Sequence, residues 1–265
     1  MTTPHRSAPA PGAGNTAKVA VIGGTGMNSW PGLEITRSTT VDTPYGAPSA
    51  PLVHGSVAGI EAIFLARHGE GHKIPPHAIN YRANLWALKN AGVEQVIAIG
   101  AVGAIAGWFA PGALAVPNDL VDYTWGREHT LFDGRPGSGL KHIEFNQPYA
   151  PSVRKALLEA ARAAGVDVRD GGVMAVTQGP RLESPGEIRR LRQDGCDMVG
   201  MTSMPEAGLA AELALPYACL AVSVNWAPGI GSGDIHGQIE HWLALSMAKV
   251  RAILEKALPE LAGRS

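Results

Sequence analysis

The chain has 265 residues, of which 22 are Lys or Arg and 23 are Asp or Glu, so its formal net charge at pH 7 is −1. A chain of this length can bury one sizeable core, and α/β folds of this size are commonly single units. The nearly balanced charge supplies no field to hold a polyanion, so neither nucleic acid nor an anionic membrane is expected as a partner.

The first residues and the two cysteines bear on where the protein works. Residues 1–17 are rich in Pro, Ala and Gly and lack the apolar core of a signal peptide, so a flexible tail is expected. No stretch approaches the roughly 20 apolar residues of a membrane span. Cys196 and Cys219 lie in apolar segments and are expected to be buried thiols in a reducing compartment. We therefore expect a cytoplasmic protein with one domain over residues 18–265.

Short β-branched runs recur along the chain, each too continuously apolar to be half exposed. They predict strands at residues 18–24, 60–67, 94–103, 112–117, 173–179, 196–202 and 217–225. Helical patterns predict helices at 77–92, 151–165, 184–195 and 204–215, and a last helix from about residue 236 to about 258, ended by Pro259. This alternation predicts an α/β fold with a central mixed or largely parallel sheet flanked by helices. Ligands of such sheets bind outside the carboxyl ends of the strands.

Residues 117–150 break this alternation. The segment is long, polar and aromatic, with little periodicity. Long irregular segments in compact domains are usually functional or interfacial. The segment is therefore a candidate for a lid or for a contact between subunits.

A glycine-rich loop follows the first predicted strand. In Gly23-Gly24-Thr25-Gly26, backbone N–H groups and the Thr25 hydroxyl can cradle a phosphate. Its spacing does not match the dinucleotide fingerprint, because Ser29 stands in place of the third glycine. A plain tight turn explains the loop equally well.

A cluster of histidines follows the second predicted strand. Arg67 offers a planar fork of donors to an oxyanion, and His68 beside it can donate another hydrogen bond. His68, Glu70, His72 and His77 are also of the residue types that bind zinc, although the Arg67 guanidinium would repel a cation. A phosphate site, a metal-dependent hydrolase and a solvated loop all remain open from this segment.

Polar residues also stand at the ends of three later strands. Glu183 precedes a predicted helix, where it can accept a hydrogen bond from a ligand N–H or support the helix N-terminus. Thr202 and Ser203 stand where a strand meets a helix, a position suited to an oxyanion, whereas the spacing of Met201 is typical of a core residue. Asn225 ends the last strand, and its carboxamide can both donate and accept hydrogen bonds to a ligand or tie down the irregular backbone that follows.

The motifs "VIGGTG", "DTPYGAPS", "LARHGEGH", "NYRANLWALK", "GAVG", "QGPRLE" and "VGMTSMPEA", followed by the strand ending at Asn225, appear in this order from about Lys18 onward. In this combination the chain resembles the purine nucleoside phosphorylase and methylthioadenosine phosphorylase family. It is most similar to the bacterial branch that acts on S-methyl-5'-thioinosine. The resemblance implies an α/β phosphorylase fold, a homotrimer or a dimer of trimers, and no metal or organic cofactor.

The resemblance also implies the reaction and its phosphate site. A nucleoside and inorganic phosphate would give a free base and a ribose 1-phosphate. Met201 would lie against the ribose. The implied phosphate-binding residues are Thr25, Arg67, His68 and Thr202, together with the backbone of Gly100 and Ala101.

The implied base pocket contains Glu183 and Asn225 as catalytic residues, with Trp226 and Ala227 beside them. Adenine-specific members of the family carry aspartates at the positions of Asn225 and Ala227 and a small hydroxyl residue at that of Glu183. Hypoxanthine presents an N1–H donor to Glu183 and O6 and N7 acceptors to the Asn225 amide, whereas adenine N1 has no proton to give a carboxylate. The residues therefore favour a 6-oxopurine.

A second set of residues is implied to contact the group at the ribose 5'-position. Ile235, His236 and Ile239, with His72, are implied to shape that pocket. Methylthioinosine is the expected substrate, and methylthioadenosine, inosine and guanosine are the alternatives within the same chemistry. Outside it, the alternatives are a metal-dependent hydrolase and a nucleoside-binding protein without catalysis.

Overall fold

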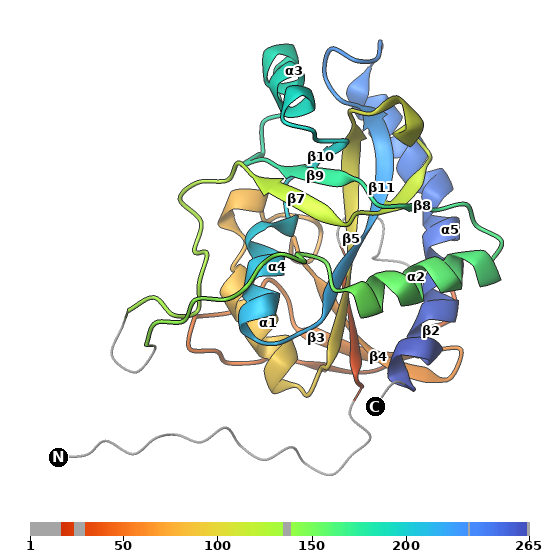
Figure 1. The fold of residues 1–265 in the computed structure, drawn as a ribbon. Helices are drawn as coiled ribbons and strands as arrows, with labels where there is room; N and C mark the ends of the chain where they lie inside the picture. The colour runs from red at the N-terminus through yellow and green to blue at the C-terminus, as the bar shows by residue number, and fades with distance from the viewer. Residues whose placement is uncertain (1–16, 24–29, 135–138, 233, 264–265) are drawn as a thin grey trace.

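The computed structural model describes residues 17–263 except for 24–29, 135–138 and 233 (Figure 1). Residues 1–16 of the expected tail therefore lie outside the described residues. Ala17, the last residue that we assigned to that tail, is buried in the hydrophobic core.

The described strands form one mixed sheet in which β5 and β11 are central. β5 pairs in parallel with β1 and β11 and antiparallel with β10. The path across the sheet is β2-β3-β4-β1-β5-β10-β9-β7, while β11 also pairs with β6, and β6 with β8. The strands are β1 (Val19–Gly23), β2 (Leu33–Thr39), β3 (Leu52–Val57), β4 (Ile60–Ala66), β5 (Gln95–Ala104), β6 (Leu114–Val116), β7 (Asp119–Asp122), β8 (Arg169–Asp170), β9 (Val173–Val176), β10 (Met198–Gly200) and β11 (Tyr217–Trp226).

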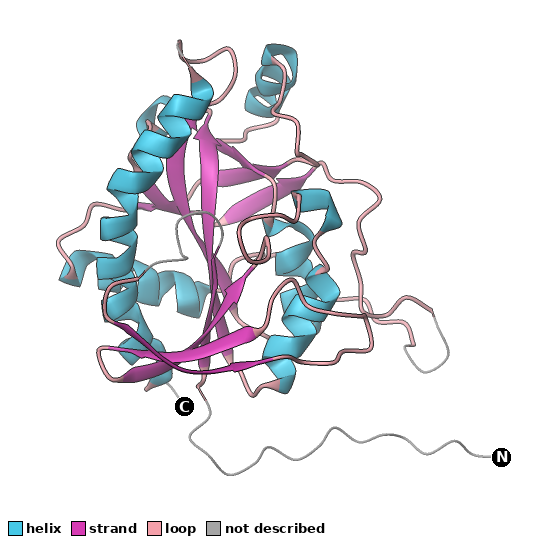
Figure 2. Ribbon diagram, turned by 180° about the vertical axis from the view of Figure 1, so that it is seen from behind, coloured by secondary structure: helices cyan, strands magenta, loops and turns pink. Residues whose placement is uncertain are grey.

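The sheet is covered by helices, as the alternating pattern predicted. α2 and α5 pack against each other and against β11, and α1 packs against α4 (Figure 1). Seen from behind, α5 runs along the length of the sheet (Figure 2). The helices are α1 (Tyr81–Asn90), α2 (Pro151–Ala163), α3 (Pro185–Gln193), α4 (Ser203–Glu212) and α5 (Ile235–Ala262), with short 3-10 turns at Pro76–Ala78 and Gly107–Phe109. None of the helices in the described part of the chain has the length and apolar character needed to cross a bilayer.

All seven predicted strands are present, but two expectations were wrong. Pro259 does not end the last helix, which continues to Ala262. Proline removes one backbone hydrogen bond, and burial of Leu258 and Leu261 on the core side supports this last turn. Residues 117–150 are also not wholly irregular, because β7 lies within them and pairs in parallel with β9.

Candidate active site

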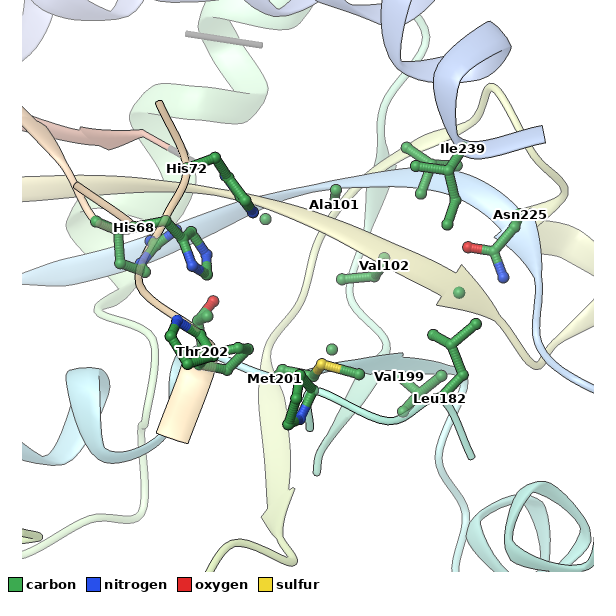
Figure 3. Close-up of a pocket in the computed structure, with 18 of the residues that line it drawn as sticks. His68, His72, Ala101, Val102, Leu182, Val199, Met201, Thr202, Asn225 and Ile239 are labelled. Atoms are coloured by element: carbon green, nitrogen blue, oxygen red, sulfur yellow. The ribbon is translucent and has the colours of Figure 1, made fainter. Parts of the chain in front are cut away.

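A cavity of about 400 Å³ lies at the carboxyl ends of β5 and β11 (Figure 3). Its wall combines the loop after β4, the second half of β5, the segment before α3, the end of β10 and the end of β11. In Figure 3, His68 and Thr202 lie at one end and Asn225 and Leu182 at the other, with Met201 between them. Ten residues singled out from the sequence line this one cavity: Arg67, His68, His72, Gly100, Ala101, Glu183, Met201, Thr202, Asn225 and Ile239.

Four described candidates are not part of this wall: Trp226, Ala227, Ile235 and His236. Thr25 lies outside the described residues. The Trp226 side chain packs against Gly231 in the following loop. The contact is so close that a Cβ added to Gly231 would lie 2.7 Å from Cγ and Cδ1 of the Trp226 ring. Ala227 is buried in a small separate apolar cluster, and His236 is exposed at the start of α5. Among the described residues of α5, Ile239 rather than His236 reaches the cavity.

A bulge in β11 brings Asn225 into the cavity. The pairing of β11 with β5 shifts register between Ser223 and Asn225. Val224 is the extra residue, so Asn225 takes the position opposite Gly103 that Val224 would hold in a regular strand. Bulges beside active sites commonly re-aim a side chain in this way.

The Asn225 carboxamide is only partly committed to the protein. It is 5% exposed, and Nδ2 donates a hydrogen bond to the Trp226 carbonyl oxygen over 2.8 Å. This bond fixes the side chain and uses one of the two Nδ2 hydrogens. The other Nδ2 hydrogen and Oδ1 can serve a ligand. The backbone-tying role and the ligand-binding role are therefore compatible.

Glu183 is a buried carboxylate in the same wall. It is 8% exposed, and its Oε1 accepts a hydrogen bond from Thr177 Oγ1 over 2.6 Å. The N-terminus of α3 is capped by Ser184, which forms a reciprocal capping box with Glu187. Since the helix has its own cap, Glu183 is not needed for that purpose; it lines this cavity and also a second one, whose wall includes Thr177.

Arg67 is buried in a bidentate ion pair that the sequence did not indicate. Its Nε and Nη2 donate to Glu206 Oε2 and Oε1 over 2.7 and 2.8 Å, and Nη1 donates to the Ile99 carbonyl oxygen. Burial alone would lower the pKa of Arg67, but the charge and hydrogen bonds of Glu206 raise it above its ordinary value. Tyr217 also donates to Glu206. Arg67 therefore lines the cavity as part of an ion pair with no net charge, and two of its guanidinium nitrogens are bound to Glu206.

His68 is a neutral ring with one nitrogen fixed by the backbone. Its Nδ1 lies 2.8 Å from the Ile74 carbonyl oxygen, and its ring stacks on His72 with centroids 4.2 Å apart. Burial lowers the pKa of His68 to about 4, despite the opposing effect of that carbonyl. The neutral ring must place its proton on Nδ1 to donate to Ile74, which leaves Nε2 as a hydrogen-bond acceptor.

Thr202 has a free role in the cavity wall, and the described histidine loop does not form a metal site. Thr202 precedes α4 without using its hydroxyl as a helix cap, and it lies in the cavity wall. In the part of the chain that the structure describes, no group of three or more His, Cys, Asp or Glu side chains is arranged to hold a metal ion. Cys196 and Cys219 are buried free thiols, as predicted.

Comparison with known proteins agrees with this geometry. A family model described as "Phosphorylase superfamily" matches residues 18–259. The chain belongs to the phosphorylase superfamily. Among members of this superfamily, a probable S-methyl-5'-thioinosine phosphorylase of Xanthomonas campestris pv. campestris is 47% identical over 94% of this chain and 97% of its own length. The 6-oxopurine nucleoside phosphorylase of Pyrococcus furiosus is 40% identical over 91% of this chain and 92% of its own.

Solved structures of phosphorylases share the fold. A mutant adenosine/methylthioadenosine phosphorylase of Schistosoma mansoni in complex with methylthioadenosine superposes with a TM-score of 0.88. It is 32% identical and covers 94% of this chain and 93% of its own. The single-domain α/β phosphorylase fold expected from the sequence is thus confirmed.

Proposed function

We propose that this chain catalyses phosphorolysis of a 6-oxopurine nucleoside, with S-methyl-5'-thioinosine as the preferred substrate. The products would be hypoxanthine and 5-methylthioribose 1-phosphate. The observation that carries the proposal is that Glu183 and Asn225 line one cavity together with the histidine loop. Two relatives described as probable S-methyl-5'-thioinosine phosphorylases, 47% and 51% identical to this chain, support the same reaction.

The base preference follows from hydrogen-bond polarity. Thr177 occupies Glu183 Oε1 and leaves Oε2 to accept the N1–H of hypoxanthine. The second Nδ2 hydrogen of Asn225 is available to O6 or N7 of the base. Adenine would place the N1 lone pair against the Glu183 carboxylate, and a mispaired buried polar contact of this kind discriminates by about 10²- to 10⁵-fold.

The mechanism needs a bound phosphate on one face of the ribose and a stabilised base on the other. A phosphate oxygen forms the new bond to the anomeric carbon while the bond to purine N9 breaks, and the electron pair of that bond leaves on the base. Asn225 meets this developing negative charge by donating toward N7 or O6, while Thr202 donates to the phosphate and His68 Nε2 accepts a hydrogen bond from a protonated phosphate oxygen. Preorganised donors supply this stabilisation, so the proposal includes no metal or organic cofactor.

The 5'-methylthio preference rests on the apolar part of the wall. Ile239 from α5 supplies an aliphatic surface, which suits a thiomethyl group better than a hydroxyl. Methylthioadenosine phosphorylase activity is the second candidate, since solved structures similar to this chain include such enzymes. The carboxylate at Glu183 argues against an adenine base.

We further propose that the protein is cytoplasmic and forms a homotrimer through the 117–150 segment. Trp125 is 71% exposed and Leu140 is 80% exposed, and both lie in this segment. Contiguous exposed apolar patches mark contact surfaces, and the proposal is that these two side chains contribute to such a patch. Sedimentation of the purified protein would measure the oligomer.

The test is a substrate panel of methylthioinosine, methylthioadenosine, inosine and guanosine, each with and without phosphate. Base release is followed by liquid chromatography. The expected result is phosphate-dependent release of hypoxanthine, fastest from methylthioinosine. Equal consumption of the nucleoside without phosphate would show hydrolysis and refute phosphorolysis. Faster turnover of methylthioadenosine than of methylthioinosine would overturn the base assignment.

A further inference from the structure

Arg127 is a buried arginine whose donors converge on backbone carbonyls around the cavity. It is 8% exposed and lies in the 117–150 segment. Nη2 donates to the carbonyl oxygens of Thr177 and Gln178 over 3.2 and 2.8 Å. Nη1 donates to those of Met201 and Met204 over 2.8 and 2.6 Å. Nε donates to the Gln178 side chain, and the guanidinium lies over the Tyr81 ring.

These acceptors belong to two segments that leave neighbouring strands. The parallel pairing of β9 with β10 ends at Val176 and Gly200, followed by one more bond from Thr177 N to the Gly200 carbonyl oxygen. Beyond this point, ladder bonds no longer set the distance between the two segments. Arg127 donates hydrogen bonds to both segments just beyond the last ladder bond. Its guanidinium therefore links the two segments where the sheet no longer does.

Each segment carries a different part of the cavity. Thr177 holds Glu183, so the first segment sets the side expected to face the base. Met201 and Thr202 follow β10, so the second sets the side expected to face the ribose and phosphate. A displacement of one relative to the other would move the base away from the anomeric carbon.

We propose that Arg127 is a positioning residue that holds the base side and the ribose side of the cavity in register. The inference rests on the proposed phosphorolysis. Arg127 does not line the cavity in the described structure, so it acts through Thr177 and Met201 rather than on the substrate. Nη1 serves one segment and Nη2 the other, a separation of donors that a lysine ammonium, with all three donors on one nitrogen, does not reproduce.

The test compares R127K with R154K. Arg154 also donates to backbone carbonyls, those of Pro117 and Val116, and pairs with Asp170, but it lies outside the cavity wall. With the nucleoside that the wild type uses best, R127K is expected to lower kcat/KM for the nucleoside by about 10- to 100-fold, because a misplacement of about 1 Å can have this effect. The KM for phosphate should change less, and R154K should remain close to the wild type.

Rescue separates positioning from folding. Millimolar methylguanidinium added to R127A should restore part of the lost kcat/KM for the nucleoside, while R154A should not respond. If R127K and R154K lose the same small amount, or if R127A loses thermal stability without any rescue, the positioning role is wrong. A wild-type enzyme that releases no base in the presence of phosphate would instead refute the proposed function, so the two failures are distinguishable.

Discussion

Thr177 Oγ1 donates a hydrogen bond of 2.6 Å to Glu183 Oε1, whereas the Gly200 carbonyl oxygen lies 3.4 Å from the same hydroxyl. A hydroxyl has one proton, and the shorter contact assigns it to the carboxylate. The bond fixes which oxygen of Glu183 remains for a ligand.

Replacing this hydroxyl should weaken the base site. T177V keeps the shape of the side chain but leaves the buried carboxylate without its donor. Hydrogen bonds to charged groups contribute about 1.5–3 kcal/mol, so kcat/KM for methylthioinosine should fall by about 10- to 100-fold. Steady-state kinetics measures the change. T177S keeps the donor and should stay near the wild type, and equal losses in both variants would contradict the assignment.

Exchange of the two base-reading groups should change the substrate. In E183Q/N225D, the Gln amide can donate to adenine N1 and the carboxylate can accept from the exocyclic amine. The ratio of kcat/KM for methylthioinosine to that for methylthioadenosine should fall at least about tenfold. N225D alone should improve neither substrate. An unchanged ratio in a folded double variant would show that these groups do not read the base.

Ile239 and His236 allow a matched test of the 5'-position. I239N places a polar group against the expected thiomethyl site. The ratio of kcat/KM for methylthioinosine to kcat/KM for inosine should fall by about tenfold or more, which is the effect of a lost apolar contact. H236A should leave this ratio unchanged, because His236 lies exposed outside the cavity wall in the described chain. The kcat/KM ratio for the two nucleosides gives the answer, and the opposite ranking of the variants would restore the sequence-based role of His236.

His68 should make stability depend on pH. Its pKa is lowered by burial from 6.5 in the unfolded chain to about 4. Between these values the unfolded chain binds the proton more readily, so His68 should reduce stability progressively as the pH falls from about 6.5 to about 4. Thermal unfolding of the wild type and H68N across this range checks the effect. Identical slopes for the two proteins would assign the pH dependence to another group.

The sequence predicted the buried strands well because burial on both faces requires apolar residues throughout a strand. β2 escaped this pattern because most of its residues are exposed. The site residues at strand ends were also visible, since each follows an apolar run as a polar break. The sheet topology then brought five of them, Arg67, His68, Glu183, Thr202 and Asn225, to one cavity.

The residues that support the site could not be found in this way. Glu206 is 139 positions from Arg67 and had the local character of an acidic residue in the first turn of a helix. Arg127 lies in a segment without periodicity, and its acceptors are backbone carbonyls, which carry no side-chain signal. Trp226 and Ala227 were assigned from the family resemblance, and the described structure does not include them in the cavity wall.

The extra residue in β11 has a consequence for redesign. Because the bulge is a property of backbone pairing, the location from which position 225 meets a ligand does not depend on which side chain stands there. Substrate choice and backbone geometry can therefore be varied separately. A library confined to positions 183 and 225 would change the functional groups that contact the base while the backbone that carries them stays the same. Deleting Val224, the extra residue, would leave Asn225 opposite Gly103 but would remove a side chain from the cavity wall.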